Sequence, residues 1–264
     1  MLTAVKNQIR VCLLSVKYNI MREMINKVTF LTNIGFMMLN NAAFIIQWLI
    51  LLHIREEVGG YTMKEVMLLW GLAASTYGFS HIFFARAFSL PELIINGKLD
   101  SYLVQPKNVL FGVITSSTNT SAIGDLLYGL VLVCLFCFSI KRLFLFLLFT
   151  VTGAVILTAY AVLLGSLSFW FVRADVFGYN MVNSMISFAT YPDGIFDGAT
   201  KVILYYVIPV GVEIYMPVHI MRNFDPAGLF FVMGYAVLLF AAAAAFFYRG
   251  LKRYTSSNLM AARM

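Results

Sequence analysis

Few side chains in this 264-residue sequence are of the types that carry out chemistry. Cys134 and Cys137 form a C-x-x-C pair, a spacing found in zinc and redox sites. They lie in the apolar run LVLVCLFCF, with no second pair and no nearby histidine. We therefore interpret both thiols as small packing residues rather than metal ligands or a redox couple.

The remaining catalytic patterns are also missing from the sequence. His53, His81 and His219 are too scattered to predict a metal cluster. There is no H-E-x-x-H motif, and no G-x-x-x-x-G-K-[ST] loop through which the chain could bind ATP. We expect a chain that is not itself an enzyme and that holds no cofactor or metal of its own.

Three ionisable side chains fall in apolar surroundings. Asp125 and His81 are predicted near the inner ends of membrane spans, and Glu213 lies in an apolar segment between two predicted spans. Carriers coupled to protons or sodium usually show buried carboxylates or broken helices in paired repeats. We find no such repeat.

The amino-acid composition indicates the kind of fold in which these ionisable side chains lie. The chain is 61% hydrophobic and 12% charged, with a mean hydropathy of +0.85, whereas soluble domains carry about 25% charged residues. The predicted fold class is all-α, a polytopic membrane protein. The net charge of +7 is assigned to cytosol-facing loops and lipid headgroups rather than to nucleic acid.

A membrane span needs about 20 apolar residues, and six segments are predicted to span. They cover residues 28–54, 63–88, 120–139, 143–172, 176–191 and 227–248. With both termini in the cytosol, thirteen Lys and Arg lie inside and six outside, as the positive-inside rule prefers. Lys141 and Arg142 are exceptions to this rule, because the predicted topology places them in a short outer loop.

Residues 1–26 are too polar to span. Val11, Leu14, Tyr18 and Met21 recur at helical spacing among basic residues, which predicts an amphipathic helix on the inner leaflet. The alternative is a soluble helical cap for a cytosolic partner.

Residues 192–225 are too apolar for a loop in water, yet a full span there would place the C-terminus outside. We predict an outer hairpin that enters and leaves the same leaflet, turning or kinking at Pro209 with Gly211. The alternative is a seventh span kinked at Pro209.

Residues 89–107 form the longest predicted cytosolic loop. Pro91 suits the first turn of a short helix over 90–96, with Ser89 as its cap and Gly97 as its stop. Such a helix would stand off the membrane and suit contact with a cytosolic protein. The next helix either projects into the cytosol or breaks near TSSTNTS.

Two stripes of amides lie on predicted spans, Asn33, Asn40 and Gln47 on the first and Asn180 and Asn183 on the fifth. They indicate either helix packing or the lining of a pathway. Gly71, Ala74 and Gly78 form a small-residue seam for close helix packing.

Two motifs carry a family resemblance that spans the whole chain. LPELIINGKLDSYLVQP lies in the cytosolic loop, and YPDGIF with VIPVGVEIYMPV lies in the outer segment. Together with the order of segments, they resemble the permease subunit of a bacterial ABC transporter of the type-2 exporter family. The resemblance implies a dimer with a second copy or a paralogue in the cell membrane. It also implies separate cytosolic subunits that bind ATP–Mg and drive transport.

The resemblance assigns roles to individual positions. Residues 1–26 would be the elbow helix and 249–264 a cytosolic tail of a single permease domain over 1–264. The helix that couples to the ATPase would comprise Leu90, Pro91, Glu92, Leu93, Ile94 and Ile95. The pathway or dimer interface would include Asn33, Asn40, Gln47, Asn180 and Asn183. The outer gate would include Tyr191, Pro192, Pro209, Glu213 and Pro217.

Two other functions stay open on the sequence alone. One is a membrane scaffold or assembly factor that transports nothing. The less favoured one is a membrane-embedded enzyme that modifies lipids.

Overall fold

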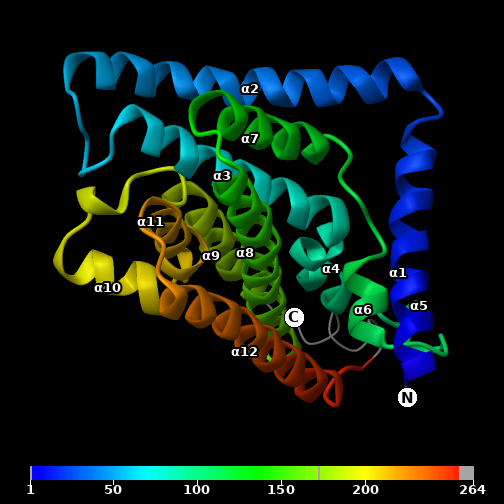
Figure 1. The fold of residues 1–264 in the computed structure, drawn as a ribbon. Helices are drawn as coiled ribbons and strands as arrows, with labels where there is room; N and C mark the ends of the chain where they lie inside the picture. The colour runs from blue at the N-terminus through cyan, green and yellow to red at the C-terminus, as the bar shows by residue number, and fades with distance from the viewer. Residues whose placement is uncertain (1, 172, 256–264) are drawn as a thin grey trace.

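The computed structural model describes residues 2–171 and 173–255 (Figure 1). Within these ranges the chain is helical and no strand is present, apart from an isolated bridge between Val58 and Tyr61. The predicted all-α class is confirmed.

Four helices are long and apolar enough to cross a membrane. They are α2 (Lys27–Ile54), α3 (Met63–Phe83), α8 (Ile140–Ser166) and α12 (Pro226–Leu251). The chain is thus a multi-pass membrane protein. The third and fifth predicted spans correspond to α7 (Ala122–Phe136) and α9 (Ala174–Phe188), with 15 residues each. Such helices are about 22 Å long, shorter than a hydrocarbon core of about 30 Å.

Helices α3, α7 and α8 form the core. Gly78 of α3 is packed so closely on α7 that an added Cβ would lie 2.6 Å from the backbone nitrogen of Leu126. Gly71 packs in the same way against Gly129 of α7. A Cβ added to Gly129 would overlap the carbonyl oxygen of Gly71. The predicted small-residue seam on α3 therefore holds α7. Helices α2 and α12 have mostly exposed surfaces.

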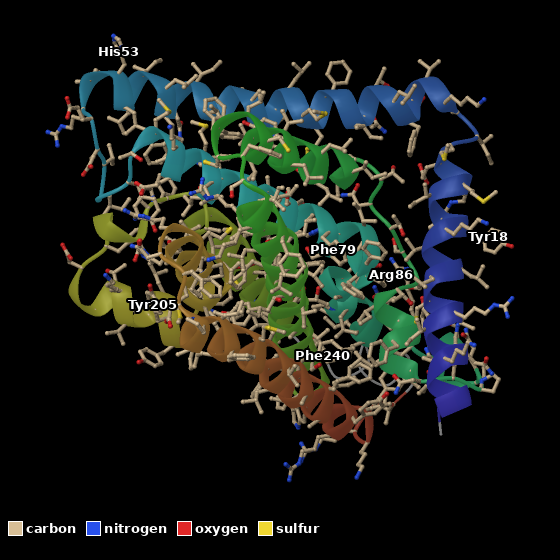
Figure 2. The ribbon with its side chains drawn as sticks, viewed as in Figure 1. Tyr18, His53, Phe79, Arg86, Tyr205 and Phe240 are labelled. Atoms are coloured by element: carbon tan, nitrogen blue, oxygen red, sulfur yellow. The ribbon has the colours of Figure 1, made fainter. Side chains whose placement is uncertain are left out.

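The helix α1 (Leu2–Glu23) runs across the direction of α2 (Figure 1). Its small polar side chains face the rest of the chain: Ser15 Oγ donates to the carbonyl of Thr115 at 3.0 Å, and Asn19 Nδ2 to that of Ser116 at 3.1 Å. Apolar side chains such as Leu13 and Tyr18 are exposed, and Tyr18 points away from the bundle (Figure 2). An exposed apolar face suits a lipid surface better than a soluble cap.

Short helices gather at the same end of the bundle as α1, here called the α4 end (Figure 1). They are the 3₁₀ helix η1 (Ala85–Ser89) and the α-helices α4 (Leu90–Ile95), α5 (Asp100–Leu103) and α6 (Val109–Ile114). The helix before α7 breaks after Ile114, within the TSSTNTS region as one alternative predicted. Ser89 does not cap α4, because its hydroxyl donates back to the carbonyl of Arg86 at 3.4 Å.

The opposite end, here called the α10 end, carries the segment after α9. It contains η3 (Asp193–Ile195), α10 (Gly198–Tyr206), the π-helix η4 (Gly211–Tyr215) and α11 (Met216–Arg222). The chain bends by 79° between Tyr206 and Gly211, at the predicted position of Pro209. Figure 2 shows Tyr205 and His53 at this end, and Tyr18 and Arg86 at the other.

Candidate transport site

A partly open cavity of about 250 Å³ lies between helices of the bundle. Residues of α2, α3, α7, α8, α9 and η4 line it. Its lining is Met37, Asn41, Trp70, Ala73, Ala74, Tyr77, Asp125, Leu157, Asn183, Ile186, Ala189, Thr190 and Glu213. We call it the upper cavity. Its walls combine apolar and aromatic surface with a few polar groups, the usual make-up of a ligand site.

Two carboxylates line the upper cavity and both are buried. Asp125 is 3% exposed and Glu213 is 2% exposed. Asn41 Nδ2 donates a 2.6 Å hydrogen bond to Asp125 Oδ1. Oδ2 of Asp125 and Oε2 of Glu213 have no hydrogen-bond partner among the described residues. Buried carboxylates in a membrane bundle are costly and mark functional positions.

A second cavity of about 220 Å³ lies nearer the α4 end. It includes His81, Pro91 and Asp175, and we call it the lower cavity. Tyr77 of α3, together with Asn183 and Ile186 of α9, lines both cavities. The two are therefore adjacent, and together they follow α3 and α9 from Pro91 towards Glu213.

An aromatic stack connects α3 to the segment before α4. The His81 ring lies between Tyr77 and Phe88, with centroid separations of 3.8 and 4.0 Å. Its Nδ1 is 3.1 Å from the carbonyl oxygen of Tyr77. Phe88 belongs to η1, so the stack joins the segment before α4 to Tyr77, which lines both cavities.

The short helix α4 packs against the end of the bundle. Leu90, Leu93 and Ile94 are buried, and Leu90 and Pro91 lie against Gly165 of α8. Pro91 is buried as well, and Ile95 is half-buried. The apolar residues of LPELII are therefore buried by packing against the end of α8.

Glu92 is the exposed side chain of α4. Its Oε1 accepts a 2.6 Å hydrogen bond from Lys98 Nζ. This hydrogen bond and the positive charge of Lys98 lower the pKa of Glu92. Beyond it, Val104 after α5 is 84% exposed. Glu92, Lys98 and Val104 are thus exposed at the α4 end.

Asp193 is the centre of a polar cluster at the α10 end. Tyr61 donates a 2.7 Å hydrogen bond to Asp193 Oδ1, and His219 Nε2 lies 3.2 Å from both carboxylate oxygens. Burial raises the pKa of Asp193, but the hydrogen bonds of His219 and Tyr61 outweigh burial and lower it overall. Burial and the Asp193 hydrogen bond raise the pKa of Tyr61 well above its ordinary value.

An ion pair continues this cluster to the start of α3. Arg222 Nε lies 2.6 Å from Glu65 Oε1, and Glu65 Oε2 accepts from the backbone nitrogen of Thr62 at 2.8 Å. The second contact is part of a capping box. The two ends of the segment from Asp193 to Arg222 are thus held together.

The family model described as ABC-2 family transporter protein matches residues 37–258. The chain belongs to the ABC-2 transporter family. Membership supports a role as a transport permease, as the motifs in the cytosolic loop and outer segment predicted. Searches of curated proteins and of solved structures gave no match.

In this ABC-2 family member, the predicted pathway residues separate into two groups. Asn183 lines both cavities. Asn33, Asn40, Gln47 and Asn180 are exposed on the outside of α2 and α9, so within the single chain they do not line a cavity.

The predicted gate residues of the ABC-2 chain also occupy different surroundings. Pro192, Pro209 and Pro217 are buried at the α10 end. Tyr191 packs edge-on against Trp48, with centroids 6.0 Å apart. Glu213 instead faces the upper cavity.

Asn41, Trp70 and Tyr77 are among the lining residues that the sequence analysis did not identify. Asn41 directly follows the exposed Asn40, and the two adjacent amides gave no signal as to which faced inwards. Asp125 was noted in the sequence as an ionisable group in apolar surroundings, and in the structure it lies on α7 three residues after Ala122, which is fully buried.

Proposed function

We propose that this ABC-2 protein is the membrane subunit of an ATP-driven exporter, working as a dimer with a second copy or a paralogue. The adjacent cavities along α3 and α9 carry the proposal, because they extend from α4 towards η4 inside a chain of a transporter family. Separate cytosolic subunits would bind ATP–Mg, since the chain has no P-loop motif.

The proposed membrane topology follows from the two ends of the bundle. The α4 end faces the cytosol of the cell, with both termini and the elbow helix α1 there. Six crossings would be made by α2, α3, α7, α8, α9 and α12. The segment from Asp193 to Arg222 would be an outer re-entrant hairpin, and its tied ends support this over a seventh span.

The proposed contact with the ATPase lies on the exposed surface of the α4 end. Glu92 and Val104 would make it, with the half-buried Ile95 at its edge. Leu90, Pro91, Leu93 and Ile94 would instead transmit movement, because they pack on α8. The His81 stack would carry that movement to the cavities.

The proposed dimer contact uses the exposed faces of α2 and α9. Asn33, Asn40, Gln47 and Asn180 lie on these faces. In a membrane, exposed amides are stabilised by partners on another helix. A second copy would supply such partners and close the pathway on its open side.

The decisive experiment is to purify the tagged chain together with the products of its neighbouring reading frames. We expect it to bring down a P-loop ATPase, and the complex to hydrolyse ATP whereas the chain alone does not. Recovery with other membrane proteins and no ATPase would favour a scaffold. Loss of a lipid-modifying activity on substitution of a single His or carboxylate would favour an enzyme.

A further inference from the structure

The two carboxylates of the upper cavity face a space that no basic side chain of the described chain shares. None of the residues that line this cavity is Lys, Arg or His. Tyr77 is the other titratable residue of its lining, and the adjacent lower cavity adds His81, Asp175 and Tyr179. The cavity is therefore acidic.

We propose that the upper cavity binds the ammonium head group of an amphipathic cation, and that such cations are the substrate class of this transporter. This assignment deepens the proposed transport function and rests on it. Glu213 and Asp125 would supply the countercharge, and the unpartnered Oε2 and Oδ2 atoms would be the contacts. In a low-dielectric site, a carboxylate and a cation stabilise one another far more than in water.

Of the two carboxylates, Glu213 gives the stronger support for cation binding. Its side chain is 98% removed from solvent, yet no described group neutralises or hydrogen-bonds its Oε2 atom. It sits in the π-helix η4, an irregularity that is often found at functional sites. An ionised carboxylate in this position is costly, so the group either takes up a proton or binds a cation from outside the chain.

The walls of the cavity favour an organic cation over a metal ion. Trp70 and Tyr77 are aromatic residues that attract ammonium groups through their ring faces. Leu157 and Ile186 are apolar and suit the carbon atoms next to an ammonium nitrogen. In the described part of the chain, no three His, Cys, Asp or Glu side chains gather as a metal site would require.

The size of the cavity indicates a head group rather than a whole molecule. Drug-sized ligands fill pockets of about 300–1,000 Å³, and the upper cavity has about 250 Å³. An apolar tail would therefore extend into the adjacent lower cavity or towards lipid. Amphipathic amines have this shape.

The test is the binding of radiolabelled decyltrimethylammonium to the full chain in lipid nanodiscs, with empty nanodiscs subtracted. We expect saturable binding that decanol and sodium chloride do not displace. Glu213→Gln and Asp125→Asn should each weaken binding about tenfold or more, since each removes one partner of a buried charge pair. Glu213→Asp, which keeps the charge, should retain more affinity than Glu213→Gln. Glu56→Gln, an exposed carboxylate on the loop before α3, should bind as the unmodified chain does.

The proposal is overturned if both amide variants bind within twofold of the unmodified chain, or if decanol displaces the cation equally well. Displacement by sodium would assign the site to a metal ion instead. If Glu213→Gln does not elute as a monodisperse species, Asp125→Asn and Glu213→Asp decide the outcome. The assay needs one chain only, so it is separate from the ATPase test: a chain can recruit an ATPase and fail to bind the cation, or the reverse.

Discussion

The hydroxyl of Tyr61 donates a 2.7 Å hydrogen bond to Oδ1 of Asp193, joining two positions 132 residues apart in the sequence. Tyr61 lies in the loop between α2 and α3, and Asp193 opens the segment that leads to α10. His219 of α11 contacts the same carboxylate. One buried carboxylate therefore holds three segments of the α10 end together.

Asp193→Asn is expected to lower the thermal unfolding midpoint of the chain in detergent. The substitution keeps the shape but removes the charge that Tyr61 and His219 contact, and hydrogen bonds to charged groups contribute about 1.5–3 kcal/mol each. Asp197→Asn is the matched control, because Asp197 is exposed a few residues further on. Equal midpoints for the two variants would contradict a structural role for the Asp193 cluster.

The contribution of Asp193 should also depend on pH. Its folded-state pKa is lowered despite burial, by its bonds to His219 and Tyr61, and the unfolded value is about 3.9. A lowered carboxylate pKa adds stability that is complete above the unfolded value and is lost as the pH falls through the folded value. The midpoint difference between the unmodified chain and Asp193→Asn should therefore shrink as the pH falls from about 5 to below 4. A difference that grows over this acid range would contradict the lowered pKa of Asp193.

Glu92→Arg should abolish stimulation of the partner ATPase while leaving the chain folded. Glu92 is exposed and its partner Lys98 is exposed as well, so the substitution reverses a surface charge and disturbs no core contact. Glu57→Arg makes the same change on an exposed loop at the α10 end and should leave ATP turnover unaltered. Unchanged turnover in Glu92→Arg would count against the contact proposed for α4.

Leu93→Asp is not an equivalent test of coupling, although it lies next to Glu92. Leu93 is 2% exposed, and an unpaired carboxylate at a buried position costs at least about 2 kcal/mol. We expect this variant to aggregate or to run with a lowered unfolding midpoint. If Leu93→Asp unfolds like the unmodified chain and still uncouples the ATPase, α4 must leave the bundle in the complex.

Much of the scaffold could be predicted from the sequence, because hydropathy and proline chemistry are local. The long apolar runs located α2, α3, α8 and α12, and Pro209 located the 79° bend. The close approach of α3 to α7 followed from Gly71 and Gly78, since only small residues permit it.

The site itself could be predicted only in part, because it depends on which side of each helix faces inwards. A hydrophobic helix in lipid lacks the polar outer face that marks orientation in a soluble protein. Asn40 and Asn41 could not be distinguished for this reason. The Asp193 cluster joins residues from three distant segments, and no spacing within one segment indicates it.

Gly78→Ala should destabilise the pairing of α3 with α7. The added methyl group would lie 2.6 Å from the nitrogen of Leu126 and 2.7 Å from the carbonyl oxygen of Ala122, so the helices must separate, at a cost of about 1–3 kcal/mol. Gly234→Ala on α12 is the control, because nothing lies within 4 Å of the new methyl group. The control should be neutral or slightly stabilised, since alanine is the better helix former. Equal unfolding midpoints for both would refute the close-packed seam.

The pathway along α3 and α9 predicts how residue 183 changes its accessibility during transport. Asn183 lines both cavities, so a thiol placed there should be reached from one side of the membrane in each state of the transporter. In a chain whose Cys12, Cys134 and Cys137 are replaced by serine, Asn183→Cys should react with an impermeant maleimide at different rates with and without ATP. Glu56→Cys, on the exposed loop before α3 and outside both cavities and the proposed dimer faces, controls for general changes in access of the reagent. If ATP changes the labelling rate equally at both positions, or does not change it at position 183, the cavities are not part of the transport pathway.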